Sequence, residues 1–229
     1  MTIPYGAHFV FIGDSITHGL RNDKELNPAF KLGAGFVNHI ASKLWLENPG
    51  AVLVFTNRGI CGNTVLELGA RWEADALSLS PDVLTVLIGV NDNNQRHLKP
   101  GKPSTSPTEY GVVLEKLLCR ARQHNPSMLI VVVEPFLLSS VALVGQKLEA
   151  ALEEMTARGQ EARRCCEQCG GVFVPMQSAF ADACLQAPPE FWSYDGIHPT
   201  AAGFALITQE WFKAVAPNVE HASEDNVYA

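Results

Sequence analysis

The sequence predicts an α/β protein, a three-layer α/β/α sandwich around a five-stranded parallel sheet. Three observations lead to this prediction. The 229 residues are 47% hydrophobic, which is enough apolar material for one full core. Short, almost uninterrupted apolar runs recur along the chain, with longer helix-like segments between them. Charged residues make up only 18% of the chain, unlike the composition of a disordered protein.

The predicted strands are the short apolar runs. Each run is hydrophobic at nearly every position, whereas a strand with one solvated face would alternate between apolar and polar residues. We therefore expect a parallel sheet that is covered on both faces. The strands are expected at His8–Ile12, Val52–Thr56, Val83–Ile88, Leu129–Val133 and Val172–Val174.

The predicted helices lie between these strands. Asn63 or Thr64 can cap the second helix, and Pro107 is a suitable residue to open the third. Repeated β-α units favour right-handed crossovers, which place helices on both faces of the sheet. The helices are expected at Gly35–Leu46, Thr64–Leu79, Thr108–Gln123, Leu143–Cys169 and Thr200–Val215.

The chain shows no internal repeat and no linker, which predicts one domain over residues 1–229. The core is expected at about residues 7–216, and the polar tail 217–229 is expected to be flexible. Residues Asn93–Pro107 are polar and rich in Pro, Ser and Lys. We expect this segment to be a long loop with a functional role.

The composition argues against several classes of partner. The formal net charge is −7 with a pI near 5.5, and Lys and Arg form no cluster, which disfavours nucleic acids and anionic membranes. No apolar run reaches the roughly 20 residues that a membrane-spanning helix needs. The first residues lack the features of a signal peptide, so a cytoplasmic location is expected. The sequence leaves open whether the chain forms homo-oligomers.

The six cysteines are expected to be reduced. Three of them stand alone among apolar neighbours and are expected in the core, at Cys61, Cys119 and Cys184. The other three form a cluster at Cys165, Cys166 and Cys169. A zinc site needs about four ligands at matched spacing, and neither a second pair nor a nearby His supplies them. We therefore favour reduced cysteines at a helix end, and expect no metal and no cofactor.

Residues suited to acyl transfer follow the predicted strands, at the edge where parallel sheets bind their ligands. Ser15 comes directly after the first strand, and Asp195 lies three residues before His198, ahead of the last helix. A serine needs an adjacent base to become a nucleophile, and a carboxylate can orient the imidazole of that base. We therefore expect Ser15 as nucleophile, His198 as base and Asp195 as its orienting group. Taken alone, a helix cap and an Asp turn are the ordinary explanations of these two motifs.

Hydrogen-bond donors for an oxyanion follow other strands. Gly62 can offer a backbone N–H at close approach, Asn91 can offer its side-chain amide, and the backbone N–H of Ser15 lies at a helix start. Each of these is an ordinary turn or cap residue by itself. Their order along successive strand ends favours a catalytic interpretation.

Four sequence blocks resemble the SGNH, or GDSL-type, serine hydrolases. F-I-G-D-S-I-T resembles the family's block around the nucleophile, N-R-G-I-C-G-N-T its second block, I-G-V-N-D its third and D-G-I-H-P its last. The blocks follow the family's order, and together with the flanking α/β pattern the resemblance extends from Phe9 to about Phe212. The resemblance implies the flavodoxin-like SGNH hydrolase fold and a metal-free serine esterase. Its triad would be Ser15, Asp195 and His198, and its oxyanion hole Ser15, Gly62 and Asn91.

The same blocks are similar to bacterial GDSL acetylesterases that act on carbohydrates. A small ester with a short acyl group, above all an acetylated carbohydrate, is therefore the expected substrate. Its pocket is expected to include Asp14, Trp192 and Tyr194. The polar sequence N-N-Q-R-H after Asp92 departs from the aromatic residue expected in those relatives.

Three alternatives remain open from the sequence. The enzyme could act on longer acyl groups as a lysophospholipase or thioesterase. A metal-dependent hydrolase would use hard ligands at the same edge, but the group contains only one His. The ligands of such a metal-dependent hydrolase would be Asp14, Asn91, Asp92, Asp195 and His198. The third alternative, a non-catalytic binding domain, is disfavoured because every catalytic block is intact.

Overall fold

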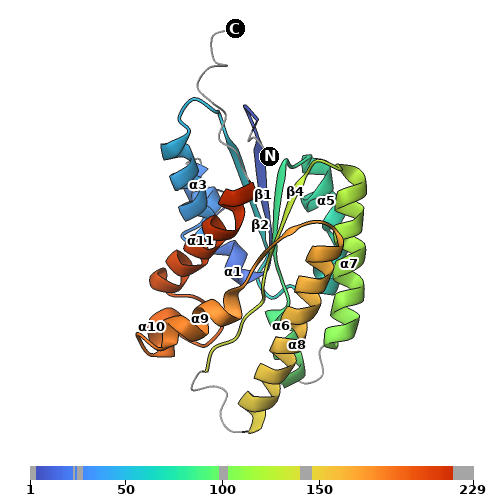
Figure 1. Ribbon diagram of the computed structural model, residues 1–229, viewed down its shortest axis with the longest axis vertical. Helices are drawn as coiled ribbons and strands as arrows, with labels where there is room; N and C mark the ends of the chain where they lie inside the picture. Colours follow the sequence, from blue (N-terminus) through green and yellow to red (C-terminus); the bar gives the residue numbers. More distant parts are fainter. Residues whose placement is uncertain (1–3, 23, 25–27, 98–102, 140–145, 219–229) are drawn as a thin grey trace.

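The computed structural model describes residues 4–22, 24, 28–97, 103–139 and 146–218. Its centre is a five-stranded parallel sheet with the order β2-β1-β3-β4-β5, which lies between two layers of helices (Figure 1). The fold class is therefore the one predicted. The strands are β1 (His8–Gly13), β2 (Val54–Gly59), β3 (Val83–Leu87), β4 (Leu129–Val133) and β5 (Val172–Val174).

The side chains of each strand alternate between two apolar cores. Phe9 and Phe11 of β1 face one core, whereas Val10 and Ile12 face the other, and none of the four is more than 1% exposed. Strands β3 and β4 divide their side chains in the same way. Burial on both faces explains why these strands are apolar at consecutive positions in the sequence.

The helices form the two outer layers. On one face α3 (Phe36–Glu47), α9 (Met176–Cys184) and α11 (Ala201–Val215) cover the first core, where the rings of Trp211 and Phe11 lie 6.3 Å apart. The opposite face is covered by α4 (Val65–Ala70), α5 (Trp72–Asp75), α7 (Pro107–His124) and α8 (Gln146–Gln168), and α7 and α8 lie side by side (Figure 1). The short helices are α1 (Ser15–His18), α2 (Pro28–Leu32), α6 (Val90–His97) and α10 (Pro189–Trp192), with the 3-10 turns η1 (Leu77–Leu79) and η2 (Ala216–Asn218).

The strand order places a switch point between β1 and β3. The chain leaves β1 toward β2 on one side and later returns to form β3 on the other side of β1. Loops that leave two such strands diverge, and open α/β sheets bind ligands in the crevice between them. The loops after β1 and β3 are those that carry Ser15 and Asn91.

Two predicted elements differ in their bounds. Strand β2 begins at Val54, because Val52 has φ +51°, a left-handed conformation that a strand cannot adopt. The helix predicted over Thr64–Leu79 is broken into α4, α5 and η1. The break falls at Arg71, whose backbone leaves the helical region and whose side chain turns toward the sheet edge.

The segment Asn93–Pro107 is not one long loop. Its first residues complete α6, since Asn93 is buried and its Nδ2 donates to the Ala151 carbonyl of α8 at 3.2 Å. Residues 98–102 of this segment lie outside the described residues, as do 143–145 of the fourth predicted helix and 219–229 of the tail. Helices α2, α6, α9 and α10 are additional to the five predicted helices, as is the short α1 that begins at Ser15.

The cysteines divide differently from the prediction. Cys61 and Cys119 are exposed and Cys184 is only partly buried, so the expectation that these three belong to the core was wrong. The cluster at the end of α8 is buried, and burial raises the pKa of Cys165 to about 11 and that of Cys166 to about 12. Such thiols stay protonated, which makes them poor nucleophiles and poor metal ligands.

Within the described part of the chain, no helix is both long enough and apolar enough to span a bilayer.

Candidate active site

Ser15 is placed by the sharp turn that follows β1. Asp14 is the N-cap of α1, and its Oδ1 accepts a hydrogen bond from the Ile16 N–H at 2.9 Å. Ser15 is therefore the first helical residue, and the capping role is taken by its neighbour. This arrangement leaves the Ser15 hydroxyl free to interact with a side chain from another part of the fold.

The turn from Asp195 to His198 builds the second half of the site. Asp195 Oδ1 accepts hydrogen bonds from two backbone N–H groups, those of Ile197 at 2.9 Å and His198 at 2.7 Å. Gly196 lies between them with φ +86°, a conformation that favours glycine. The other carboxylate oxygen of Asp195 is thereby left for the imidazole.

These two segments meet across the sheet edge. His198 Nε2 lies 2.9 Å from Ser15 Oγ, and His198 Nδ1 lies 2.6 Å from Asp195 Oδ2. The side chains of His198 and Asp195 are 35% and 36% exposed, so a substrate can reach the group. With Nδ1–H held by the carboxylate, Nε2 can accept the Ser15 proton. The arrangement is chemically competent to make Ser15 a nucleophile.

The two carboxylates of the site have opposite electrostatic environments. Burial would raise the pKa of Asp195, but hydrogen bonds from the His198 backbone and side chain outweigh it and lower that pKa. Asp14 is fully buried, and burial raises its pKa to about 7 against the opposing effects of the Ile16 N–H and His198. Asp195 is thus kept ionised, as a partner of an imidazolium must be.

The loop after β2 is pressed against the nucleophile turn. A Cβ on Gly59 would overlap the backbone of His18 in α1, so only glycine fits at this position. Beyond it, Asn63 N–H donates to the Ile60 carbonyl at 3.3 Å and closes a four-residue turn. Gly62 is the third residue of this turn and has φ +81°, as a type II turn requires.

Asn91 lies at the start of α6, just beyond β3. Its side-chain Nδ2 donates to the Asn63 carbonyl at 3.1 Å, which attaches it to the turn that contains Gly62. The structure therefore brings the predicted donor loop and the predicted donor amide into direct contact, at the switch point of the sheet.

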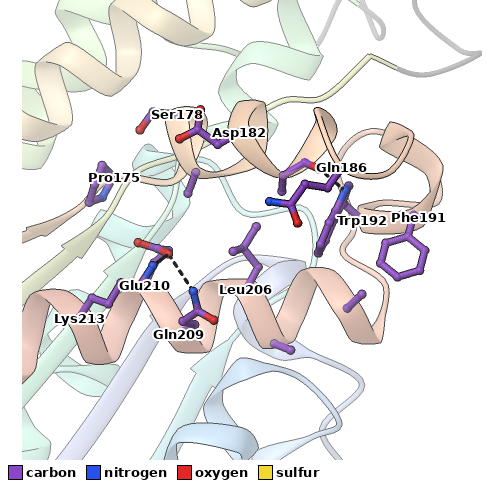
Figure 2. A pocket seen from close by; sticks show the side chains of 14 residues that line it. Pro175, Ser178, Asp182, Gln186, Phe191, Trp192, Leu206, Gln209, Glu210 and Lys213 are labelled. Carbon is purple, nitrogen blue, oxygen red and sulfur yellow. Dashed lines mark hydrogen bonds and ion pairs between the residues drawn. The ribbon is translucent and has the colours of Figure 1, made fainter.

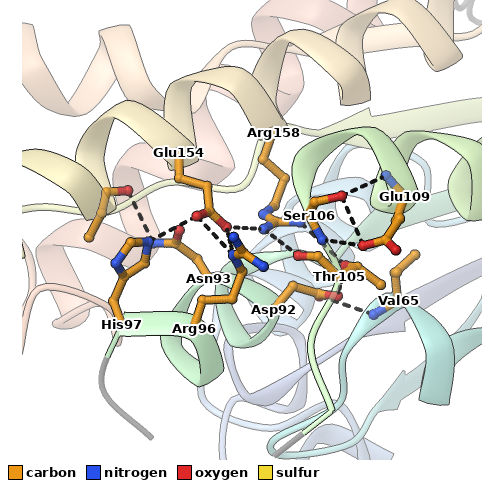
Figure 3. Close-up of polar contacts among 11 residues, drawn as sticks. Val65, Asp92, Asn93, Arg96, His97, Thr105, Ser106, Glu109, Glu154 and Arg158 are labelled. Carbon is orange, nitrogen blue, oxygen red and sulfur yellow. Dashed lines mark hydrogen bonds and ion pairs between the residues drawn. The ribbon is translucent and has the colours of Figure 1, made fainter. Parts of the chain in front are cut away.

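A buried polar network holds Asp92 of α6 in place (Figure 3). Asp92 is fully buried and accepts hydrogen bonds from the Thr105 hydroxyl at 2.5 Å and the Val65 N–H at 3.1 Å. Arg158 of α8 is also fully buried and donates to the Thr105 carbonyl at 3.0 Å and to Glu154 at 2.8 Å. This network connects the residue next to Asn91 to α4, to α8 and to Thr105 in the segment that precedes α7.

The three residues predicted for the substrate pocket lie in different environments. Tyr194 is 66% exposed, and its ring stacks on the His198 imidazole with centroids 5.6 Å apart. Asp14 is buried under the turn, where a substrate cannot touch it, so its prediction as a pocket residue was wrong. Trp192 is held by its indole N–H, which donates to the carbonyls of Ala183 and Ala187 at 3.2 Å.

Trp192 lines a cavity of about 590 Å³ between α9, α10 and α11 (Figure 2). None of Ser15, Asp195, His198, Gly62 and Asn91 lines this cavity. A second cavity, of about 380 Å³, adjoins the predicted oxyanion loop and is lined by Gly62 together with both polar side chains and the apolar Leu66 and Pro103. Of the five site residues, Gly62 alone lines the second cavity, so its link to the site is through the predicted oxyanion loop; its polar lining includes Asn63, Glu67 and Gln95.

Two supporting residues were not found from the sequence. Arg71 and Arg158 are charged residues inside helical segments, where an arginine ordinarily marks a solvated face. Only their burial distinguishes them, since the side chain of Arg71 is 14% exposed and that of Arg158 is 0% exposed. Among the residues that the structure describes, no group of three or more His, Cys, Asp or Glu side chains is arranged to hold a metal ion.

The comparisons with known proteins agree with this geometry. Residues 11–206 match the GDSL-like Lipase/Acylhydrolase family. The chain is 28% identical over 218 residues to an acetylxylan esterase of Geobacillus stearothermophilus, with 94% of this chain and 96% of that protein covered. A crystal structure of a protein from Parabacteroides merdae, described as GDSL-like lipase, superposes with a TM-score of 0.86 at 33% identity, covering 94% of this chain and 99% of the other.

A crystal structure of the acetylxylan esterase from Geobacillus stearothermophilus superposes with a TM-score of 0.83 at 28% identity, covering 94% of this chain and 96% of the other. The family match spans most of the chain and includes all four blocks in full. The chain therefore belongs to the GDSL-like lipase/acylhydrolase family and is a carboxylic ester hydrolase.

Proposed function

We propose that the enzyme hydrolyses esters through an acyl-serine intermediate on Ser15. His198 Nε2 takes the Ser15 proton as Oγ attacks the ester carbonyl. The same imidazolium then protonates the leaving alcohol, and a water molecule activated by His198 releases the acid. The observation that carries this proposal is the hydrogen-bonded line from Asp195 Oδ2 through His198 to Ser15 Oγ, with distances of 2.6 and 2.9 Å.

The tetrahedral oxyanion would be stabilised by three donors. These are the backbone N–H groups of Ser15 and Gly62 and the side-chain amide of Asn91. The contact between Asn91 Nδ2 and the Asn63 carbonyl supports this assignment, because it holds the amide beside the Gly62 turn. An amide has two N–H bonds, so one can hold this contact while the other faces the substrate.

The substrate we propose is a short-chain acyl ester, above all an acetyl ester of a carbohydrate. The relative from Geobacillus stearothermophilus is an acetylxylan esterase, and its solved structures include catalytic mutants in which a serine or an aspartate is replaced by alanine. Tyr194 presents an exposed ring beside His198, a surface suited to a sugar ring. The cavity next to Gly62 offers Asn63, Glu67 and Gln95 as hydrogen-bonding partners for the hydroxyl groups of such a substrate.

An acyl-chain series tests this proposal. We expect kcat/KM for 4-nitrophenyl esters to fall from acetate through butyrate to octanoate, and Ser15→Ala to abolish turnover of each. In an apolar acyl groove every added methylene would instead contribute about 0.8 kcal/mol, and kcat/KM would rise. Faster turnover of octanoate than of acetate would exclude an acetylesterase and favour a lysophospholipase or thioesterase.

The carbohydrate part is tested with Tyr194 and a matched pair of variants. Tyr194→Phe keeps the ring, and Tyr194→Ala removes it. If the ring stacks on a sugar, Tyr194→Ala raises KM for an acetylated xylo-oligosaccharide but not for 4-nitrophenyl acetate, and Tyr194→Phe changes neither. Equal effects of Tyr194→Ala on both substrates would contradict recognition of the sugar by this ring.

We also propose that the chain from about residue 7 to residue 216 forms a single catalytic domain. We further propose that the enzyme works in the cytoplasm. The six cysteines are all unpaired, which fits a reducing compartment.

A further inference from the structure

Arg71 lies between α4 and α5, and its guanidinium group points to the edge of the sheet where the reaction site is. Three of its hydrogen bonds reach two different segments, the end of β1 and the stretch from the end of β2 into the following loop. Nη2 donates to the Gly13 carbonyl at 2.8 Å, Nη1 to the Arg58 carbonyl at 2.7 Å and Nε to Asn63 Oδ1 at 2.7 Å. One side chain thus joins the end of β1 to both ends of the loop that follows β2.

The acceptors of Arg71 are immediate neighbours of the proposed oxyanion donors. Gly13 precedes Ser15 by two residues, and Asn63 follows Gly62 directly. The Asn63 carbonyl in turn accepts the hydrogen bond from Asn91 Nδ2. Each donor is therefore close to an acceptor of Arg71. One residue separates Gly13 from Ser15, Gly62 is adjacent to Asn63, and Asn91 donates to the Asn63 carbonyl.

The chemistry of the contact requires arginine. A planar guanidinium carries five N–H donors in a fixed fork and can serve several acceptors in different directions, whereas a lysine ammonium donates from a single atom. Asp75 completes the set by accepting from Nη1 at 2.9 Å, and it balances a charge that faces the nearby cations Arg21 and Arg58. The side chain is 14% exposed, so water competes little for these bonds.

We propose that Arg71 is a positioning residue that fixes the relative placement of the three oxyanion donors. This inference rests on the proposed function, because it assigns Arg71 a role toward the donors named there. Donors of an oxyanion hole act on charge that develops in the transition state. Loss of their alignment therefore lowers kcat and leaves KM nearly unchanged.

Steady-state kinetics of Arg71→Lys with 4-nitrophenyl acetate test the proposal. We expect kcat to fall by about 10- to 100-fold, with KM within about twofold of the wild-type value. Arg120→Lys is the matched control, because Arg120 also pairs with a carboxylate, Glu73 at 2.8 Å, but is 47% exposed and touches neither loop. Its kcat should equal that of the wild type.

Circular dichroism shows whether Arg71→Lys is folded. If it is not, Asn63→Ala provides a second test. It removes the side-chain amide whose Oδ1 accepts from Arg71, and it should also lower kcat. The combined Arg71→Lys/Asn63→Ala variant should lose less than the product of the single losses, because both changes break the same contact. An unchanged kcat in Asn63→Ala, or a pure KM effect in Arg71→Lys, would overturn the proposal.

Ser15→Ala, measured in parallel, separates this inference from the proposed function. If Ser15→Ala retains turnover, the proposed nucleophile is wrong. If Ser15→Ala is inactive while Arg71→Lys behaves like Arg120→Lys, the nucleophile stands and the positioning role of Arg71 is excluded.

Discussion

Asp14 offers a direct test of the electrostatics under the nucleophile. Its side chain is 1% exposed, its Oδ1 accepts the Ile16 N–H, and its Oδ2 has no hydrogen-bond partner among the described residues. Burial is the main reason that its pKa rises to about 7, and the nearby carboxylate of Asp92 adds to the rise. Asp14→Asn keeps the shape of the side chain and removes its titration.

The direction and size of the effect follow from the raised pKa. An aspartate in the unfolded chain titrates near 3.9, so between about pH 4 and pH 7 the folded protein holds a proton that the unfolded chain has lost. The free energy of unfolding therefore falls as the pH rises through this window. From pH 5 to pH 8 this one group should cost the wild type about 2.5 kcal/mol, and Asp14→Asn should not show that loss.

Denaturant unfolding at pH 5 and pH 8 measures this directly. The comparison between the two pH values cancels any constant cost of the substitution, such as a weaker helix cap. Ser15→Ala serves as the control, because it alters the same turn without removing a titrating group, and it should keep the wild-type pH dependence. Equal free-energy differences between Asp14→Asn and wild type at both pH values would refute the raised pKa.

Further variants test the proposed roles of other residues. Ser15→Ala and His198→Ala should each abolish turnover, and the double variant should lose no more than either single one, since the two act as a unit; multiplicative losses in kcat would contradict that. Asn91→Ala should lower kcat by roughly 10²- to 10³-fold with little change in KM, as for removal of one oxyanion donor, and a pure KM effect would assign it to ground-state binding. Arg158→Met should lower the free energy of unfolding by about 3–5 kcal/mol because it breaks a buried ion pair, whereas Arg163→Met, 52% exposed on the same helix, should change it by less than about 1 kcal/mol. EDTA should leave kcat unchanged, and a stoichiometric metal that is required for turnover would contradict the serine mechanism.

The sequence by itself was sufficient for the fold class and for the identity of the strands. A strand that is buried on both faces must be apolar at consecutive positions, so β1, β3 and β4 could be located almost to the residue. The reactive groups could be listed for a related reason. The turn from Asp195 to His198 is local, and four consecutive residues contain both the carboxylate and the imidazole that it orients.

Only the tertiary structure decided which groups meet and what holds them. Ser15 and His198 are 183 residues apart, and their contact depends on the loops that diverge around the switch point of the sheet. Arg71 and Arg158 look like surface residues in the sequence, because charge and helical position do not reveal burial. Both also donate to backbone carbonyls, which every residue possesses, so no residue type marks those contacts in the sequence. The reactive side chains of this protein could therefore be predicted from its sequence. Their relative positions depend on contacts with backbone groups that only the folded chain brings together.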